Sequence, residues 1–441
     1  MKLSVLRMLL RPTPGSMGVL ALPVIAFAVV TALILTVIGG AQAFWSWTDE
    51  YAMLYQSLAA IAVVLLVVPL STLGAAAARL SARRRDEKLS TLRLLGVTAW
   101  GVGVLTVIES TLIALTGVLA GVLGSLALLP AVALIPFRGE PLGIEAIALS
   151  PMIILAVAGS IVVLAALSAI IALRQVVISP LGVRMRATTG SVHWIRAVIV
   201  VALLAAAFLT IKLAPSVVSS AIMLIVVLAG VFGVSLAVLN VIGPWVLKVI
   251  ANGQARRAAT PERLLAARMV LDSPKAAWRQ VSGIVMASFM AVFAGTGAAL
   301  MSSMASDTAT AADLALATDI RTGVIITLVG SFVMVAASVG VTQASEILDQ
   351  RPLHSSLHYL GTPMQTVDAA RRRAIMSPLL ITALGSALCA GVLVFPLLGI
   401  AMITAPISLL TIATVVAAGI GMVWLSTRVT RPLLARSFAT A

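Results

Sequence analysis

Glu109 is the residue of this 441-residue sequence whose type and position best suit a functional group. It lies well inside a long apolar segment, where a carboxylate is costly and marks a candidate functional site. A structural role, in which Glu109 bonds to Ser110, Thr111 or a neighbouring helix, explains the same position. We favour the structural role and keep Glu109 as an intramembrane candidate.

The other arrangements that could do chemistry are incomplete. His354 and His358 have the i, i+4 spacing of a metal-binding pair, but only Asp349 could add a ligand, so we predict no metal site. The phosphate-binding pattern GxxxxGKS/T does not occur, so the chain is not expected to bind ATP itself. Cys389 is the single cysteine, and no nucleophile is paired with a base. We therefore predict no catalytic residue, no cofactor in this chain and no enzymatic activity of its own.

The composition indicates what kind of structural elements the chain forms. Hydrophobic residues make up 61% of the chain and charged residues only 10%, which leaves too little polar surface to cover a soluble domain of this size. Soluble enzymes, disordered chains and fibrous proteins are thereby excluded. The net charge of +15 comes from Lys and Arg clustered between apolar runs, which is typical of helix orientation in membranes rather than of nucleic-acid binding.

Ten apolar segments are long enough to cross a bilayer as helices, which needs about 20 residues each. The predicted spans are approximately 17–40, 52–78, 98–128, 149–173, 194–213, 216–247, 277–301, 322–344, 375–396 and 402–427. The first span is too long for the apolar part of a signal peptide and is predicted to be retained. The sequence thus predicts an all-α polytopic membrane protein.

The charges predict the orientation of these spans. With both termini in the cytoplasm, all 30 Lys and Arg residues except Arg138, Lys212 and Arg321 fall on the inner side. The outer loops are short, and the longest is predicted to cover about 302–321. We expect a multi-pass protein of the plasma membrane with both termini inside.

Three sequence patterns occur twice, in the same order and at equivalent places in the topology. The pairs are KLSVLRMLL (2–10) with RLLAARMVL (263–271), RLSARRRDEKLSTLRLLGVT (79–98) with EILDQRPLHSSLHYLGTP (346–363), and ISPLGVRMR (178–186) with TRPLLARS (430–437). We infer a duplication of two parallel four-span repeats, each opened by a short basic amphipathic helix. The predicted domains are a first repeat at 1–186, a two-span linker at 187–255 and a second repeat at 256–441.

The middle pair of patterns combines basic residues with a Leu-rich helical face that ends in Leu-Gly. A basic loop anchored on lipid phosphates explains the first copy alone, but lipid anchoring does not require a second copy of the Leu-Gly pattern. Two docking helices for a cytoplasmic partner explain both copies. The predicted docking residues are Arg83, Arg84, Arg85, Glu87, Leu89, Leu92, Leu95 and Gly96 in the first copy, with Leu353, Leu357, Leu360 and Gly361 in the second.

The order of spans and these motifs resemble an FtsX-like permease, the membrane subunit of type VII (MacB-like) ABC transporters. The resemblance rests on RRRDEKLSTLRLLG (83–96), on Ser179-Pro180-Leu181 after the fourth span and on Glu109 in the third. Ten spans in a 4+2+4 order are similar to the bacitracin-resistance branch. The chain departs from that branch in lacking a large extracellular domain between the seventh and eighth spans, and Pro352 stands in the second copy where Glu87 stands in the first.

The resemblance implies a permease driven by a cytoplasmic ABC ATPase, with two ATPase copies per chain binding ATP and Mg. It implies mechanotransmission and export of an amphiphilic cargo, namely an antimicrobial peptide, lipopeptide or lipid taken from the membrane. An ion-coupled secondary transporter working without an ATPase is the alternative, and parallel repeats occur in such proteins too. A non-transporting regulator of the cell-division type fits ten spans and short loops poorly.

Overall fold

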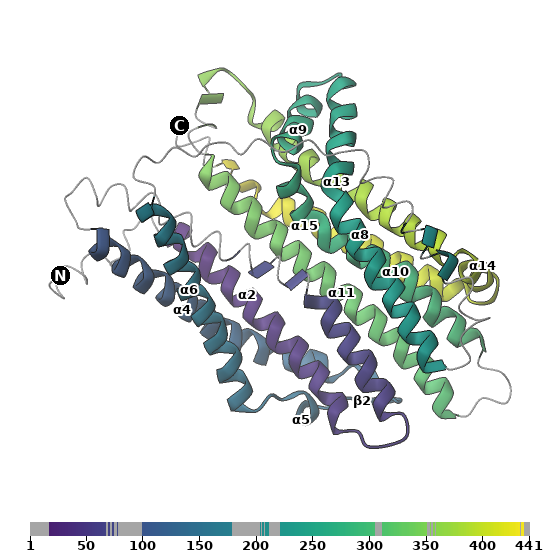
Figure 1. Ribbon diagram of the computed structural model, residues 1–441. Helices are drawn as coiled ribbons and strands as arrows, with labels where there is room; N and C mark the ends of the chain where they lie inside the picture. The colour runs from purple at the N-terminus through teal and green to yellow at the C-terminus, as the bar shows by residue number, and fades with distance from the viewer. Residues whose placement is uncertain are drawn as a thin grey trace. The chain divides into compact units, whose positions relative to one another are not determined.

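The structure, a computed structural model, describes residues 17–67, 69–70, 73–74, 77, 99–178, 203, 205–206, 208–210, 221–304, 311–350, 353, 356–357, 359–432 and 434–435. Its elements, most of them labelled in Figure 1, are α2 (Met17–Gln42), η1 (Ala43–Ser46), α4 (Ala99–Ala133), β1 (Pro136–Phe137), β2 (Glu140–Pro141), α5 (Ile144–Ile147), α6 (Pro151–Ile178), α8 (Ala221–Arg256), α9 (Pro261–Asp272), α10 (Pro274–Met304), α11 (Ala311–Asp349), α13 (Met364–Leu393), α14 (Phe395–Thr404) and α15 (Pro406–Val429).

Eight helices in the described part of the chain are long and apolar enough to cross a membrane. They correspond to α2, α4, α6, α8, α10, α11, α13 and α15. A shorter apolar helix, Ala52–Val67, lies where the second span is predicted. The predicted span 194–213 falls mostly outside the described residues. The all-α polytopic fold is therefore confirmed, and the count of ten spans stays a prediction.

The predicted start of the eighth span is wrong. Helix α11 begins at Ala311, well before the predicted start at 322, so most of the predicted loop 302–321 is helical. The helix extends past the apolar stretch because backbone hydrogen bonding does not stop where hydropathy falls. Between the last two spans, residues 395–404 form the separate helix α14.

The chain divides into two compact units near residue 188, with residues 137–139 grouped with the second. Unit 1 contains α2, α4, α5 and α6, and α4 packs against both α2 and α6. Gly121 of α4 lies against α2, where a Cβ would stand 2.5 Å from the Thr31 Cβ and 2.6 Å from the Ala28 carbonyl oxygen. Close approach of this kind, through small residues, is the usual way in which membrane helices pack.

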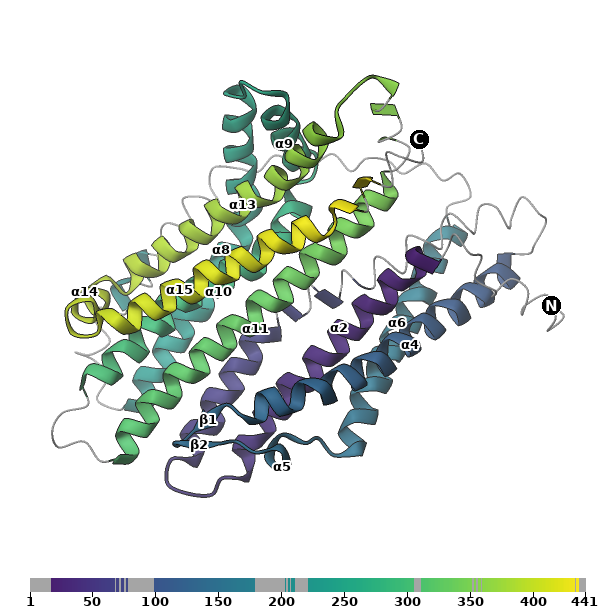
Figure 2. The ribbon, with the colours of Figure 1, turned by 180° about the vertical axis from the view of Figure 1, so that it is seen from behind.

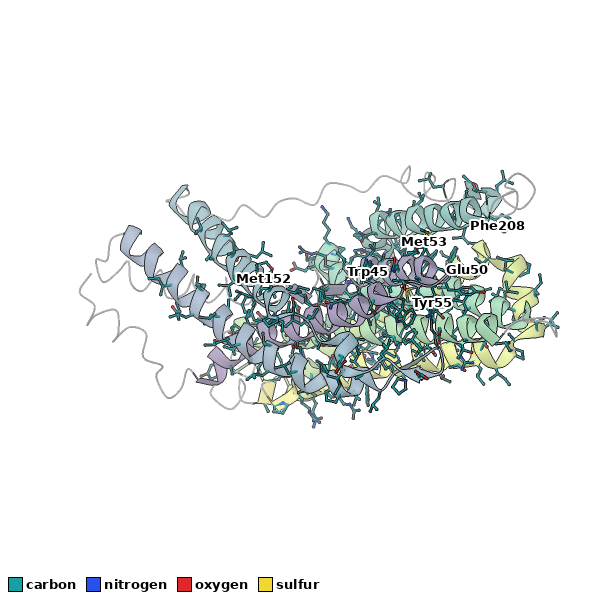
Figure 3. All side chains as sticks on the ribbon, turned by 90° about the horizontal axis from the view of Figure 1, so that it is seen from below. Trp45, Glu50, Met53, Tyr55, Met152 and Phe208 are labelled. Carbon is teal, nitrogen blue, oxygen red and sulfur yellow. The ribbon has the colours of Figure 1, made fainter. Side chains whose placement is uncertain are left out.

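The turn after α2 in unit 1 is closed by aromatic rings. Trp47 meets the ring of Phe44 edge-on at 5.2 Å and that of Tyr55 at 4.8 Å. Trp45 and Met53, labelled with Tyr55 in Figure 3, remain 53% and 78% exposed. Amphipathic aromatic rings at the end of a span suit the boundary between lipid and water.

Unit 2 is built around α10. This helix contacts α8, α11, α13, α14 and α15, and 67% of the residues in its most apolar window are buried. Phe289 of α10 is fully buried and packs with Phe232 of α8 and with Leu393 of α13. Figure 2 shows α13, α15 and α11 running alongside each other, with α14 at the end of α13 opposite to α9. We call these two ends of unit 2 the α9 end and the α14 end.

Helix α9 is the second of the two predicted amphipathic segments. It begins at Pro261, which is suited to the first turn because its fixed φ is helical and its missing N–H has no partner there. Its buried face, Ala266, Ala267 and Val270, packs on α8 and α13. The Thr260 hydroxyl donates a hydrogen bond to Glu262, which lowers the pKa of that carboxyl.

Candidate coupling site at the α9 end of unit 2

The predicted docking residues that the structure describes lie in the connector between α11 and α13, residues 350–363. Leu353 is 52% exposed, and Leu360 and its neighbour Tyr359 are 80% and 77% exposed. Leu357, in contrast, is partly buried. The connector thus presents apolar side chains outward from the end of the helical bundle while one leucine faces the bundle.

Gly361 ends the connector in a left-handed turn, with φ of 75°. The Leu360 N–H donates to the Ser356 carbonyl at 3.1 Å, and the Thr362 N–H donates to the Leu357 carbonyl at 3.0 Å. The second bond spans five residues and is typical of a Schellman motif, in which glycine takes the positive φ at the end of a helical turn. This motif fixes the direction in which Tyr359 and Leu360 project.

Leu357 anchors the connector to the bundle. It packs on a buried cluster formed by Ile347 near the end of α11, Val367 at the start of α13 and Leu434 beyond α15. Ile347 and Leu434 are exposed by no more than 1%. Three segments that are distant in sequence therefore meet under the connector.

Next to this cluster, one carboxylate faces three guanidinium groups. Asp368 of α13 is 3% exposed at its side chain, and its oxygens lie 3.3 Å from Arg371 Nη2, 3.0 Å from Arg372 Nη2 and 3.8 Å from Arg431 Nε. Arg371 Nη2 also donates to the Thr430 hydroxyl at 3.2 Å. The pairs with Arg371 and Arg372 lie within α13, whereas the Arg371–Thr430 hydrogen bond and the Arg431–Asp368 pair connect α13 to the end of α15.

A second polar group links α10 to α11 just before the connector. Glu346 accepts hydrogen bonds from Gln343 Nε2 at 3.0 Å and from Gln280 Nε2 at 3.4 Å. Gln343 is 2% exposed and Glu346 is half-buried. Both ends of the connector, α11 on one side and α13 on the other, are therefore held by buried polar contacts.

The remaining predicted site residues fall elsewhere. The first docking segment, 83–96, lies outside the described residues, as do His354 and His358. Glu109 is half-buried near the start of α4, beside the buried Ser110, and the Thr111 hydroxyl bonds to the Val107 carbonyl rather than serving a ligand. Within the described ranges, no three His, Cys, Asp or Glu residues form a group that could hold a metal ion.

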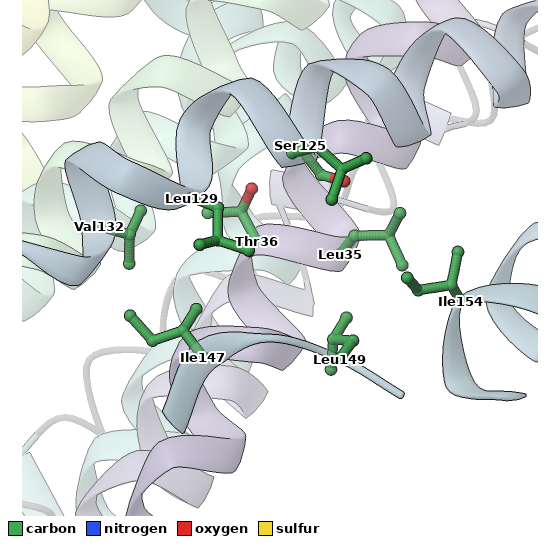
Figure 4. A pocket seen from close by; sticks show the side chains of 9 residues that line it. Leu35, Thr36, Ser125, Leu129, Val132, Ile147, Leu149 and Ile154 are labelled. Atoms are coloured by element: carbon green, nitrogen blue, oxygen red, sulfur yellow. The ribbon is translucent and has the colours of Figure 1, made fainter. Parts of the chain in front are cut away.

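Unit 1 contains a small apolar pocket of about 30 Å³ between α2, α4 and the segment before α6 (Figure 4). Leu35 and Thr36 of α2, Leu129 of α4 and Ile147 of α5 are among its lining residues. A volume of this size holds about one water molecule, so the pocket is too small for a peptide or lipid cargo.

Two residues of the site carry no signal that sequence reasoning could use. Asp368 and Arg371 have the i, i+3 spacing of an ordinary surface pair, yet both are buried and Arg371 also bonds to the distant Thr430. Thr430 itself lies in a repeated motif, but the motif does not say what it binds. The basic residues after Asp368 were assigned by sequence only to the inner side of the membrane.

Comparison with known families gives one match, over residues 59–181, to the model described as FtsX-like permease C-terminal. The matched segment includes α4, α6 and the first predicted docking segment. A search of the curated proteins gave no significant match to the chain. FtsX-like permeases are transporter components that work with ABC ATPases. The chain is a multi-pass membrane protein, and its residues 59–181 are similar to FtsX-like permeases, which supports an FtsX-like ABC permease.

Proposed function

We propose that this chain is the membrane permease of an ATP-driven ABC exporter and that its α11–α13 connector docks on a cytoplasmic ATPase. The observation that carries the proposal is the connector itself. Tyr359 and Leu360 are more than three-quarters exposed on a turn stiffened by Gly361, while Leu357 is anchored below. Apolar side chains held outward in this way favour contact with a partner surface.

The same connector provides a route for force. It continues into α11 on one side and α13 on the other, and both helices are long enough to cross the membrane. Closure of two ATPase subunits on ATP would press on the connector and on its first-repeat counterpart at 83–96. Movement carried through the spans to the far side is the mechanotransmission that the resemblance implies.

The cargo is proposed to be amphiphilic and drawn from the membrane, as an antimicrobial peptide, lipopeptide or lipid would be. The pocket described in unit 1 is too small to enclose such a molecule. Transport of the cargo along the lipid-facing surface of the helices, with lipid as a partner, is compatible with this geometry.

Copurification tests the docking role. The tagged chain would be extracted from its native host in mild detergent, and the proteins that accompany it would be identified and counted by native mass. We expect an ATPase with a phosphate-binding loop, at two copies per permease chain. Leu360→Asp should reduce its recovery at least about tenfold, because a charge on the docking face must be desolvated, whereas Leu360→Met should leave recovery unchanged. In the first copy, Leu92→Asp and Leu95→Asp should act like Leu360→Asp.

Two results would count against the proposal. Normal ATPase recovery with Leu360→Asp would remove the docking role of the connector. A stable preparation without any ATPase, whose transport persists after ATP depletion while the proton gradient is intact, would favour the secondary transporter and make Glu109 the first residue to mutate.

A further inference from the structure

The segment after α15 has a structural role that its sequence does not explain. It belongs to the third repeated pattern, TRPLLARS at 430–437. The proposed ATPase docking and force transmission do not assign any role to this pattern. The structure describes Thr430, Arg431 and Leu434 of this segment. Each of the three contacts the base of the connector by a different kind of interaction.

The first two residues hold α13. The Thr430 hydroxyl accepts a hydrogen bond from Arg371 Nη2 at 3.2 Å and donates one to the Thr427 carbonyl at 3.0 Å. Arg431 Nε lies 3.8 Å from an Asp368 oxygen, a distance that gives charge attraction without a hydrogen bond. Both contacts reach the first turns of α13, directly after the connector.

Leu434 holds the connector from below. It is fully buried, with Ile347 of α11 and Val367 of α13, in the cluster on which Leu357 packs. The segment therefore touches the helix before the connector, the helix after it and the cluster that anchors its leucine.

We propose that Thr430, Arg431 and Leu434 form a clamp that fixes the start of α13 and the Leu357 cluster to α15, so that displacement of the connector is passed to α15 and to α14 before it. The proposal rests on the proposed function for the origin of that displacement, the ATPase. Thr430, Arg431 and Leu434 are positioning residues that act through α13 and the connector.

The polar part of the clamp is sensitive to the loss of single contacts. Arg371 has two further buried donors, Nε and Nη1, that find no hydrogen-bond partner among the described residues. Its hold on α15 consequently depends on the Nη2 bridge between Asp368 and Thr430. A buried polar network that is only partly satisfied responds strongly when one member changes.

Hydrogen exchange of the full-length protein in lipid nanodiscs tests the clamp without any ATPase. Arg431→Gln and Leu434→Asn remove its ionic and apolar contacts. Arg431→Lys keeps the charge and Leu434→Met keeps the volume, and Arg428→Gln is a matched control because Arg428 lies over Trp424 instead. The readout is the exchange rate of the Leu360 and Thr362 amides, which are bonded within the connector.

We expect Leu434→Asn to speed exchange at these amides about tenfold and Arg431→Gln about three- to fivefold, because an exposed ion pair is the weaker contact, while the three controls leave exchange within twofold. Equal rates in Arg431→Gln, Leu434→Asn and the unmodified chain would overturn the clamp. Arg431 is 60% exposed at its side chain, so its replacement leaves the bundle core intact and the test decisive.

A second measurement on the ATPase complex separates positioning from plain stability. Cys389 is replaced by Ala, and Met402 of α14, which is 63% exposed, is replaced by Cys for a fluorescent label. We expect the Arg431→Gln variant to bind the ATPase with an affinity within twofold of that of the parent protein. The change in fluorescence of the label on addition of ATP and vanadate should fall at least about fivefold in this variant, and Arg431→Lys should restore it. A full response in Arg431→Gln would overturn the clamp. If the parent chain binds no ATPase, the proposed function fails while hydrogen exchange still decides the clamp.

Discussion

The indole Nε1 of Trp278 donates a hydrogen bond to Asn240 Oδ1 at 2.7 Å, which joins α10 to α8 within unit 2. Gly243, one turn further along α8, leaves the space that the Trp278 ring occupies. Asn240 is a polar residue inside an apolar span, and its side chain is used in contact with a neighbouring helix. The bond therefore stabilises the attachment of α8 to the second half of the chain.

A double-mutant cycle measures this bond. Trp278→Phe and Asn240→Leu should each destabilise the protein, and their coupling energy should be about 0.6–1.7 kcal/mol, the range for hydrogen bonds between membrane helices. Unfolding of the purified protein in detergent would be followed by circular dichroism. Strictly additive effects would show that the bond contributes nothing to stability.

The contact between α2 and α4 should be intolerant of one added methyl group. Gly121→Ala places a Cβ against the Thr31 side chain and the Ala28 carbonyl, so the helices must separate at a cost of about 1–3 kcal/mol. Gly124→Ala is the matched control, because its Cβ would lie 3.4 Å from Ala32, near ordinary contact distance. Thermal unfolding should show a lower midpoint for the first variant alone, and equal midpoints would contradict the packing.

The turn that ends the connector requires a positive φ. Gly361→Ala should cost about 1–2 kcal/mol in that conformation, and so lower ATPase affinity by about 5- to 30-fold by reducing the docking-competent population. Gly361→Asn should retain most of the affinity, because asparagine adopts left-handed conformations more readily. Titration of labelled permease with the ATPase gives the dissociation constants. An alanine variant that binds as tightly as the parent would exclude a role for the turn.

The start of α9 should depend on pH through Glu262. Its pKa is lowered in the folded helix, chiefly by the hydrogen bond from Thr260, so the ionised form stabilises the helix. This contribution is present above the pKa of the unfolded chain, about 4.3, and is lost as pH falls through the folded value. Hydrogen exchange of the first turn of α9, corrected for intrinsic rates, should be constant from neutral pH down to about pH 5 and should show the loss as the pH falls below about 4, and Thr260→Val should reduce that loss. A pH profile unaffected by Thr260→Val would contradict the assignment.

Hydropathy predicts the positions of most of the spans but not the residues at which their helices begin and end. Residues 395–404 are as apolar as a span, yet they form the separate helix α14 because Pro396 and Pro406 each occupy the first turn of a new helix. The start of α11 was placed too late for the opposite reason, since Asp313 and Asp319 lower hydropathy without interrupting the helix. Helix ends depend on local backbone chemistry, and span predictions depend on averaged polarity.

The sequence predicts the leucine pattern of the connector, but it does not predict which of the leucines are exposed and which are packed against the bundle. Leu353, Leu357 and Leu360 were assigned together as docking residues, whereas the structure buries part of Leu357 and exposes the other two. Spacing of three or four residues places side chains on one helical face and does not say which of them meets another segment. The partner of Leu357 includes Leu434, and that contact depends on the tertiary fold.

The central position of α10 has a consequence for how unit 2 is made. In the most apolar stretch of α10, 67% of the residues are buried, compared with 17% for α6 in unit 1. Its buried Ser288 and Thr296 face other helices rather than acyl chains. Helices α11 and α13, which pack along α10, both follow it in the chain. The buried face of α10 therefore has most of its protein neighbours only after both of these helices have been synthesised.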